Sequence, residues 1–315
     1  MSLLQGKSLL GLQGATREEI ELILRAAARM KAVVNSGNKK LPLLRGKSVV
    51  NMFFEPSTRT SGSFEMAANY LDASVVNFTP CGSSLVKGES FRDTLLTVTA
   101  MGVDAIVMRH KQEGSPLFAH QCVDPVIINA GDGAHEHPTQ ALLDLYTIQE
   151  VKGRIDGLKV VIVGDIDHSR VARSNVYGLK TMGADVHLVG PRTLLQPELA
   201  VALGVTFHYD LDEALEGADV INVLRIQKER QGAGFFPSDG EYYSQFGINA
   251  VRLQTAKKDV LILHPGPMNR GLEIGTDICY GSHSSIQEQV KNGLCVRMAV
   301  LYLTIIGGDE NGITR

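Results

Sequence analysis

Cysteine is scarce in this chain, and its spacing is not that of a disulfide scaffold or a metal site. The 315 residues include 4 cysteines, and no two of them form a C-x-x-C pair or stand beside a histidine at metal-ligand spacing. We therefore expect reduced, mostly structural thiols, which are typical of a cytoplasmic protein.

The chain also lacks an excess of charge of either sign and a long apolar run. Lys and Arg number 31 against 34 Asp and Glu, a formal net charge of −3 that argues against nucleic acid as a partner. No apolar stretch approaches the ~20 residues that a membrane-spanning helix needs. The opening sequence MSLLQGKSLLGLQG does not have the pattern of a secretory signal. Composition thus favours a soluble globular protein, and the length favours two domains.

Short β-branched runs alternate with helix-like segments along the whole chain. The expected strands are residues 47–54, 74–78, 104–109, 125–131, 158–165, 185–190, 219–224 and 259–267. The expected helices are residues 17–34, 61–71, 138–153, 169–183 and 285–306. This alternation predicts an α/β protein with two doubly wound parallel sheets and helices on both faces of each. We place the domain boundary near Glu150–Asp156.

The stretch FFEPSTRTSGSFE places four donor side chains, Ser57-Thr58-Arg59-Thr60, between a buried strand and a helix. Backbone N–H groups at a helix N-terminus attract anions, hydroxyls add donors, and a guanidinium matches a phosphate in shape and charge. The GxxxxGK[ST] pattern of a Walker A loop is absent. We therefore predict a phosphate site of another kind. A helix cap with a solvated arginine is the alternative.

A second cluster, GDGAHEHPTQ, follows another predicted strand. His137 precedes Pro138, which suits the first turn of a helix, and Gln140 lies one turn further on the same face. A histidine and an amide at this place can polarise a carbonyl oxygen. Two alternatives stay open, a purely structural His137 and a metal site. The metal site would use His135, Glu136 and His137, although no further ligand stands at supporting spacing.

Further cations lie at strand ends and in predicted loops. Arg109 ends its strand, and the glycine-bearing loop CGSSLVKGES carries Lys87. In the second half, Arg170 follows LKVVIVGD, while Arg225 and Gln227 follow DVINVL. Ligands of open α/β sheets bind at this carboxyl edge, so both halves offer arginines where a ligand is expected. The GxGxxG fingerprint of a dinucleotide site is missing, and we expect the second set to bind carboxylates. Solvated surface loops are the alternative.

Together these motifs resemble the aspartate carbamoyltransferase catalytic chain, in the superfamily of aspartate and ornithine carbamoyltransferases. The motifs STRTSGSFE, KGES, HPTQ, GDIDHSR, RIQKER and HPGPMNRG run from Ser57 to Gly271, and the resemblance covers essentially the whole chain. STRT and HP-x-Q are common to both branches, whereas HPTQ, RIQKER and HPGPMNRG favour the aspartate branch. The ornithine branch has HPCQ, and an HCLP motif where this chain reads HPGP.

The resemblance implies two α/β domains, with the C-terminal helix, residues 285–315, returning to the first. Residues 1–150 would bind carbamoyl phosphate and residues 151–284 would bind L-aspartate. It implies a cytoplasmic homotrimer with active sites shared between subunits, and neither a cofactor nor a metal. A regulatory chain or a dihydroorotase partner stays open, and neither nucleic acid nor a membrane is implied.

The resemblance also assigns a role to each matched residue. The residues matched to the phosphate site are Ser57, Thr58, Arg59 and Thr60. The carbamoyl oxygen would be contacted by Thr60, Arg109 and His137. The carbamoyl NH2 would be held by Gln140 and by the backbone near Gly266 and Pro267. The carboxylates of aspartate would be bound by Arg170, Arg225 and Gln227. The neighbouring subunit would supply Lys87, with Ser83 or Ser84.

The implied reaction transfers the carbamoyl group to the α-amine of L-aspartate, giving N-carbamoyl-L-aspartate and phosphate, an early step of pyrimidine (UMP) biosynthesis. Negative charge on the carbonyl oxygen would be stabilised by Thr60, Arg109 and His137. An ornithine enzyme is the first rival, but two arginines and a lysine suit a dicarboxylate acceptor better. A catalytically silent assembly subunit is the second rival, although every matched position is intact. The missing glycine fingerprint argues against a dinucleotide-dependent enzyme.

Overall fold

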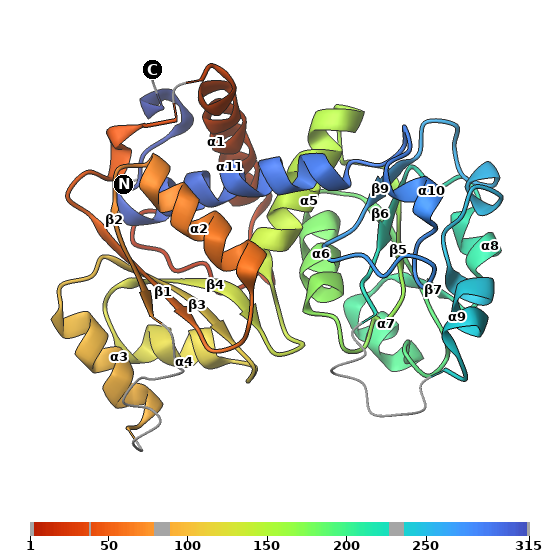
Figure 1. Ribbon diagram of the computed structural model, residues 1–315, viewed down its shortest axis with the longest axis horizontal. Coiled ribbons are helices and arrows are strands. Elements are labelled where there is room, and N and C mark those ends of the chain that lie inside the picture. The colour runs from red at the N-terminus through yellow and green to blue at the C-terminus, as the bar shows by residue number, and fades with distance from the viewer. Residues whose placement is uncertain (1–2, 38, 79–88, 227–235, 314–315) are drawn as a thin grey trace. The chain divides into compact units, whose positions relative to one another are not determined.

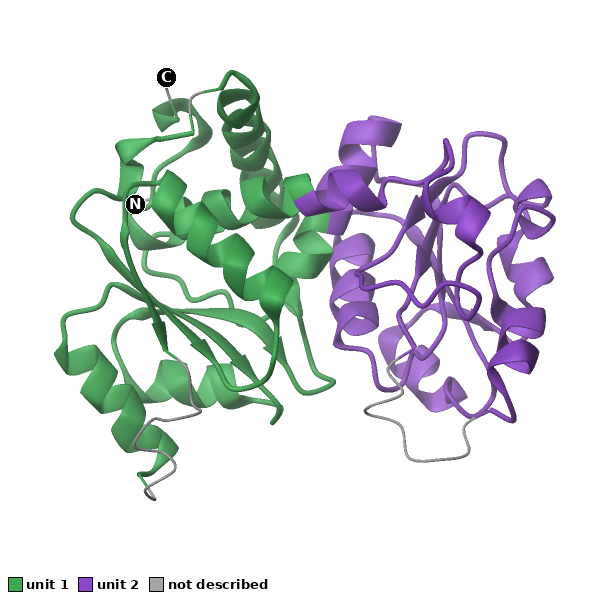
Figure 2. Cartoon of the chain, in the orientation of Figure 1, with its two compact units in different colours: residues 1–143, 291–315 green, residues 144–290 purple. Residues whose placement is uncertain are grey.

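The computed structural model describes residues 3–37, 39–78, 89–226 and 236–313. The chain divides into two compact units, unit 1 with residues 1–143 and 291–315, and unit 2 with residues 144–290 (Figure 2). Two helices contribute residues to both units, namely α5 (Pro138–Lys152) and α11 (Ile286–Ile305). The predicted return of the C-terminal helix to the first half of the chain is confirmed, because residues 291–305 group with unit 1.

Unit 1 has, in its described part, a four-stranded parallel sheet in the order β2-β1-β3-β4. The strands are β1 (Ser48–Phe53), β2 (Ser74–Phe78), β3 (Ala105–His110) and β4 (Val126–Asp132). The helices are α1 (Arg17–Asn35), the short 3-10 helix Pro42–Leu44, α2 (Thr58–Tyr70), α3 (Phe91–Ala100) and α4 (Ser115–Cys122). Helices α3 and α4 cover one face of the sheet, and α1, α2 and α11 lie over the other (Figure 1).

The two edges of this sheet differ in how they are covered. All residues of β4 are buried, because the N-terminal segment pairs with its outer edge through Leu9 N to Ile127 O and Asn129 N to Leu9 O, both 2.9 Å. At the other edge, every residue of β2 is exposed or half-buried, and Val76 is 58% exposed. A covered edge cannot pair with another chain, whereas an exposed edge strand can.

Unit 2 has a five-stranded parallel sheet within the described ranges, in the order β7-β6-β5-β8-β9. The strands are β5 (Lys159–Val163), β6 (Asp185–Val189), β7 (Thr206–His208), β8 (Val220–Val223) and β9 (Leu261–Leu263). The helices are α6 (Arg170–Thr181), α7 (Pro197–Leu203), α8 (Leu211–Leu215), α9 (Asp239–Phe246), the 3-10 helix Arg252–Gln254 and α10 (Thr276–Cys279). Helices α6 and α7 lie on one face of the sheet and α8 and α9 on the other (Figure 1).

The predicted fold class, two doubly wound parallel α/β sheets, is confirmed. Central strands are buried on both faces, as in β5 and β8, so their sequences read as continuous apolar runs and were found. Helix α1 begins with a capping box, in which the Thr16 hydroxyl accepts from Glu19 N and the Glu19 carboxylate accepts from Thr16 N. Sequence reasoning missed α3, α4, β7 and α7–α10. None of the helices in the described ranges has the length and apolar character that crossing a bilayer requires.

Candidate active site

Each sheet reverses its winding direction beside one central strand, and this reversal decides where a ligand fits. In unit 1 the chain leaves β1 toward β2 and later returns to β3 on the other side; in unit 2 the strands flanking the reversal are β5 and β8. Ligands of doubly wound folds bind outside the carboxyl ends of such strands. The predicted residues follow these strands, namely Ser57–Thr60 after β1, Arg109 at the end of β3, Arg170 after β5 and Arg225 after β8.

The start of α2 has the composition of an anion site. Ser90 and Ser169 cap α3 and α6 through their hydroxyls, whereas in the described structure Ser57 does not cap α2. The first turn of α2 carries Arg59 and no acidic residue, whereas in α1 and α3 the first-turn arginines, Arg17 and Arg92, are accompanied by acidic residues. A cation is unfavourable at the positive end of a helix dipole unless an anion accompanies it. Thr60 is buried, whereas Arg59 is exposed.

Arg109 is oriented by a carboxylate that sequence reasoning did not find. Its Nε donates to Glu55 Oε1 at 2.6 Å, and its Nη1 lies 3.5 Å from the carbonyl oxygen of Ala130. The Arg109 and Glu55 side chains are only 14% and 16% exposed, so this ion pair is partly shielded from water. Glu55 lies two residues before Ser57, the first residue of the STRT turn, and it therefore links the start of that turn to the end of β3.

His137 and Gln140 lie at the N-terminus of α5, as predicted. The carbonyl oxygen of His137 accepts from Gln140 N at 3.0 Å and from Ala141 N at 3.3 Å, so the helix begins at this histidine. Pro138 follows in the first turn, where its missing N–H costs nothing. The side chains of His137 and Gln140 are both buried.

The neighbours of His137 do not point to one common centre. The Glu136 carboxylate accepts two backbone N–H groups of the N-terminal segment, Leu12 N at 2.8 Å and Gln13 N at 3.1 Å. His135 Nδ1 instead lies 3.0 Å from Asp132 Oδ2. Because Glu136 and His135 bind different partners, their side chains do not converge with His137 on one metal-binding point.

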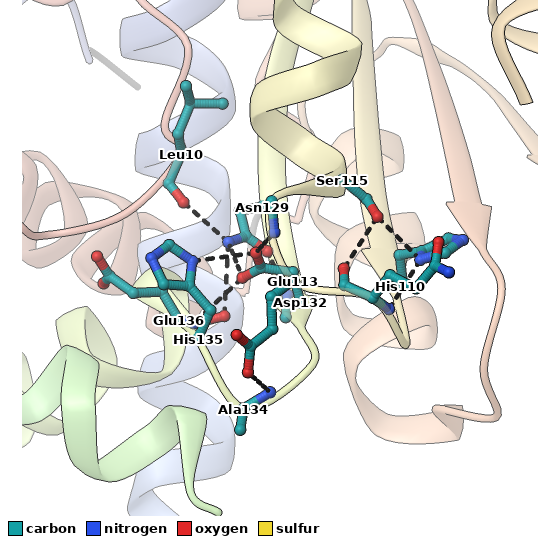
Figure 3. A network of polar contacts seen from close by, with 12 residues as sticks. Leu10, His110, Glu113, Ser115, Asn129, Asp132, Ala134, His135 and Glu136 are labelled. Atoms are coloured by element: carbon teal, nitrogen blue, oxygen red, sulfur yellow. Dashed lines mark hydrogen bonds and ion pairs between the residues drawn. The ribbon is translucent and has the colours of Figure 1, made fainter.

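The carboxylate of Asp132 forms the centre of a polar network at the end of β4 (Figure 3). Oδ1 accepts from Asn129 Nδ2 at 2.8 Å and from Glu136 N at 3.1 Å; Oδ2 accepts from Gly114 N at 2.8 Å and from His135 Nδ1. Burial alone would raise the pKa of Asp132, but these hydrogen bonds outweigh it and hold the pKa below its ordinary value. Sequence reasoning assigned no role to Asp132.

In unit 2, Arg170 occupies the first position of α6. Ser169 caps this helix by accepting from Ala172 N at 3.1 Å, and the Arg170 side chain is buried. As in α2, an arginine stands where the helix dipole disfavours a cation. Arg225 follows β8, and the carbonyl oxygen of the next residue, Ile226, accepts from Asn269 Nδ2 at 3.0 Å.

The HPGPMNRG loop is held by a buried histidine. His264 Nδ1 accepts from Gly266 N at 2.8 Å, so Nε2 carries the hydrogen and donates to Glu273 Oε1 at 3.1 Å. The Gly266–Pro267 peptide is cis, and Gly266 has a φ of +62°, a conformation that favours glycine. The loop therefore presents a defined backbone at Gly266 and Pro267.

A buried carboxylate in α5 ties this loop to the strands of unit 2. Asp144 accepts from Gln289 Nε2 at 2.7 Å, from Asn175 Nδ2 at 2.9 Å and from Asn222 Nδ2 at 3.2 Å. The amide oxygen of Gln289 in turn accepts from His264 N at 2.9 Å. Residues from the middle of α6, from β8 and from the end of β9 in unit 2 are thus joined by one chain of hydrogen bonds.

Several predicted residues lie outside the described residues. They are Lys87, Gln227 and the serine pair Ser83 and Ser84. The remaining residues divide into two sets. Unit 1 brings the STRT turn, Arg109, His137 and Gln140 to the carboxyl edge of its sheet. Unit 2 brings Arg170, Arg225 and the Gly266–Pro267 backbone to the carboxyl edge of the other sheet.

Comparison with known proteins identifies the class to which this arrangement belongs. Residues 7–150 match the family described as aspartate/ornithine carbamoyltransferase, carbamoyl-P binding domain. Residues 156–304 match aspartate/ornithine carbamoyltransferase, Asp/Orn binding domain. The chain therefore belongs to the aspartate/ornithine carbamoyltransferase family, as its motifs predicted.

Individual relatives narrow the comparison to one branch. The chain is 57% identical over 308 residues to the aspartate carbamoyltransferase catalytic subunit of Heliobacterium modesticaldum, covering 98% of each chain. It is 55% identical to that of Desulforamulus reducens, covering 98% of this chain and 99% of the relative. Among solved structures, it resembles aspartate transcarbamoylase from Trypanosoma cruzi in complex with carbamoyl phosphate and aspartate. The TM-score is 0.87 at 32% identity, covering 97% of each chain. The same enzyme in complex with N-(phosphonacetyl)-L-aspartic acid gives a TM-score of 0.84 at 32% identity, covering 97% and 98%.

Proposed function

We propose that this protein is an aspartate carbamoyltransferase, which transfers the carbamoyl group of carbamoyl phosphate to the α-amine of L-aspartate. The observation that carries the proposal is the pair of arginines, Arg59 and Arg170, each placed in the first turn of a helix at a sheet reversal point. Such positions suit bound anions, and both substrates are anions. The high identity to catalytic subunits with this name supports the choice within the family.

Carbamoyl phosphate is assigned to residues 1–150, of which residues 1–143 belong to unit 1. Its phosphate binds Ser57, Thr58, Arg59 and Thr60, where hydroxyls and the backbone N–H groups of α2 act as donors. The carbamoyl oxygen is contacted by Thr60, Arg109 and His137. The carbamoyl NH2 is held by Gln140 and by the backbone near Gly266 and Pro267.

Aspartate is assigned to the residues that follow the strands of unit 2, within residues 151–284. Its two carboxylates bind Arg170, Arg225 and Gln227, with Lys87 from a neighbouring subunit. A dicarboxylate matches this number of cations, whereas ornithine has one carboxylate and a second amine, which the arginines would repel.

The reaction on these residues needs no covalent enzyme intermediate. The lone pair of the neutral α-amine forms the new C–N bond, and the carbamoyl C–O bond to phosphate breaks with its electron pair leaving on the phosphate. Charge that grows on the carbonyl oxygen is stabilised by Thr60, Arg109 and His137, preorganised donors of a kind worth about 10²–10³ in turnover each. A phosphate oxygen accepts the proton that the amine loses, and no cofactor or metal is assigned a role.

We assign the protein to a cytoplasmic homotrimer with shared active sites, serving pyrimidine biosynthesis. The exposed edge of unit 1 supports a subunit contact there, because Val76 on β2 and Met66 on α2 are 58% and 47% exposed. Among the described residues, Cys122, Cys279 and Cys295 are not joined in disulfides, which suits a reducing compartment. A regulatory chain or a dihydroorotase remains a further candidate partner.

Paired arginine variants test the substrate assignments. Arg59→Ala should lower turnover by about 10²-fold or more, because it removes a charged donor at the phosphate. Arg170→Ala should raise the KM for aspartate at least about tenfold, the effect of one lost interaction of about 1.4 kcal/mol. Arg45→Ala and Arg154→Ala serve as matched controls, because both arginines are exposed and lie away from the carboxyl edges of the two sheets. Their turnover and KM for aspartate should stay within about twofold of wild type. Near-normal activity of Arg59→Ala would refute the phosphate assignment.

Mixed trimers test the shared site. Arg59→Ala and Lys87→Ala trimers should regain activity when their subunits are mixed, because some sites then combine an intact Arg59 with an intact Lys87. Hybrids without recovered activity would contradict the sharing of residues between subunits.

A further inference from the structure

The loop after β3, residues 111–114, and the turn before α5, residues 132–137, are joined by several hydrogen bonds. Asp132 pairs with His110 in the sheet register, and Gly133 N donates to the carbonyl oxygen of His110 at 3.0 Å. Ala134 N donates to Glu113 Oε1 at 3.1 Å. Figure 3 shows the contact between Ala134 and Glu113 beside those of Asp132. The turn that ends at His137 is therefore not a free loop.

The carboxylate of Asp132 accepts most of the hydrogen bonds that hold the loop and the turn together. It is 1% exposed, and its two oxygens accept four hydrogen bonds, two from N–H groups of the turn and its flanking strand and two from His135 and Gly114. Its own N–H donates to the carbonyl oxygen of Glu136 at 3.1 Å. Because each acceptor position is filled by a donor, rotating this carboxylate would break at least two of these bonds.

We propose that Asp132 is a positioning residue for carbamoyl transfer, which fixes the turn 132–137 and thereby places the imidazole of His137 at the carbamoyl oxygen. This inference rests on the proposed function, and it adds a residue that does not itself touch the substrate. If Asp132 were only structural, replacing it would lower the stability of the fold and leave kcat unchanged. If it positions His137, replacing it lowers kcat, and only while His137 is present.

The geometry explains why a carboxylate is needed. An amide of the same shape would present an NH2 group to two N–H donors on one side of residue 132, since an amide has only one acceptor oxygen. Because the NH2 group and these N–H groups are all donors and repel one another, the turn would have to shift to move them apart. A displacement of about 1 Å at a catalytic group is enough to cost on the order of 10²-fold in rate.

A double-mutant cycle tests the proposal on the intact trimer. Asp132→Asn should lower kcat about 10- to 100-fold while the Kd for inorganic phosphate changes less than about twofold, because the STRT turn is outside the network. In a His137→Ala background, Asp132→Asn should lower kcat by less than about twofold further, since the group that it positions is already gone. An equal factor in both backgrounds would overturn the proposal.

A matched carboxylate separates positioning from stability. Asp104, directly before β3, likewise accepts a backbone N–H, from Ser48 at 2.8 Å, but lies at the amino edge of the sheet. Asp104→Asn should lower the unfolding midpoint and leave kcat within about twofold. Unchanged kcat in a folded Asp132→Asn enzyme, with only a lowered midpoint, would likewise refute positioning.

A milder variant keeps the test decisive if Asp132→Asn does not fold. His135→Gln alters a single partner of Asp132, on a side chain that is 41% exposed. It should lower kcat about two- to fivefold in the wild-type background and leave the rate of His137→Ala unchanged. Equal effects in both backgrounds would reject the inference. A wild-type enzyme without carbamoyl transfer would instead reject the proposed function on which it rests.

Discussion

Replacing Gly11 by alanine should release the N-terminal segment from the turn that carries His137. A Cβ built on Gly11 would lie 2.2 Å from Glu136 Oε1 and 2.7 Å from its carboxyl carbon. Such distances are far inside van der Waals contact, so either the carboxylate or the backbone of residue 11 must move by about 1 Å. Both movements break the bonds from Leu12 N and Gln13 N to Glu136.

The magnitude follows from those two bonds. Hydrogen bonds to a charged group contribute about 1.5–3 kcal/mol each, so the pair is worth about 3–6 kcal/mol. Alanine in place of glycine restricts the unfolded chain and returns about 0.4–1 kcal/mol. We therefore expect Gly11→Ala to lower the free energy of unfolding of unit 1 by about 2–5 kcal/mol, a large fraction of a typical domain's stability.

Two other glycines serve as controls for the same substitution. Gly240, in α9, has no atom within 4 Å of a built Cβ, so Gly240→Ala should be neutral or stabilising by about 0.5–1 kcal/mol. Gly14 is also uncrowded but has a φ of +78°, so Gly14→Ala should cost only the backbone strain of about 1–2 kcal/mol. The three variants thus separate helix propensity, strain and collision.

Two measurements are needed, one of the unfolding midpoint in urea and one of the two hydrogen bonds to Glu136. Urea unfolding can be followed by circular dichroism, because the chain has 0 tryptophans to provide fluorescence. Amide hydrogen exchange of Leu12 and Gln13 reports directly on the two bonds and should accelerate in Gly11→Ala. A Gly11→Ala protein with wild-type exchange at these amides and a midpoint equal to that of Gly240→Ala would refute the reasoning.

Two further predictions concern pH and a buried hydroxyl. The hydrogen bond to Asp132 raises the pKa of His135 above 6.5, so this pair stabilises the fold fully below pH 6.5 and the stabilisation is lost as pH rises through the raised pKa. The lowered pKa of Asp132 has the opposite effect on the pH dependence. Its contribution to stability is present above pH 3.8 and is lost as pH falls through the pKa of Asp132 in the folded protein. The unfolding midpoint of wild type minus that of His135→Gln, measured from pH 4 to 9, should therefore shrink toward high pH; a constant difference would contradict this. Burial raises the pKa of Tyr242, and its hydroxyl has no hydrogen-bond partner among the described residues. Tyr242→Phe should thus leave the free energy of unfolding unchanged or raise it by up to about 1 kcal/mol, and a loss of more than about 1 kcal/mol in urea unfolding would show that the hydroxyl is bonded.

The sequence predicted those parts of the site that depend on local order. Ser57–Thr60 and Arg170 follow apolar strands directly, and His137 precedes a proline that suits a helix start, so strand runs and turn chemistry were sufficient to find them. The parallel topology then places them at the carboxyl edge of each sheet.

The parts that the sequence could not predict depend on partners far along the chain. Glu136 was considered as a metal ligand because it stands between two histidines, but its partner Leu12 N is 124 residues away. Glu55 bonds Arg109 across 54 residues, a pairing that requires knowing that β1 and β3 are neighbours. Asp132 closes a turn on Gly114, 18 residues earlier, which no local pattern indicates. Short elements such as β7, with three residues, carry too little periodicity to be seen.

An acceptor comparison on the purified protein tests the central claim most directly. Carbamoyl phosphate would be supplied with L-aspartate, with ornithine and with no acceptor, and both the carbamoylated amino acid and the released phosphate would be quantified. We expect N-carbamoyl-L-aspartate and phosphate in equal amounts with aspartate, and neither carbamoyl-ornithine nor enzyme-dependent phosphate release in the other two arms. Carbamoyl-ornithine as the product, or no product from a folded trimer, would contradict this expectation.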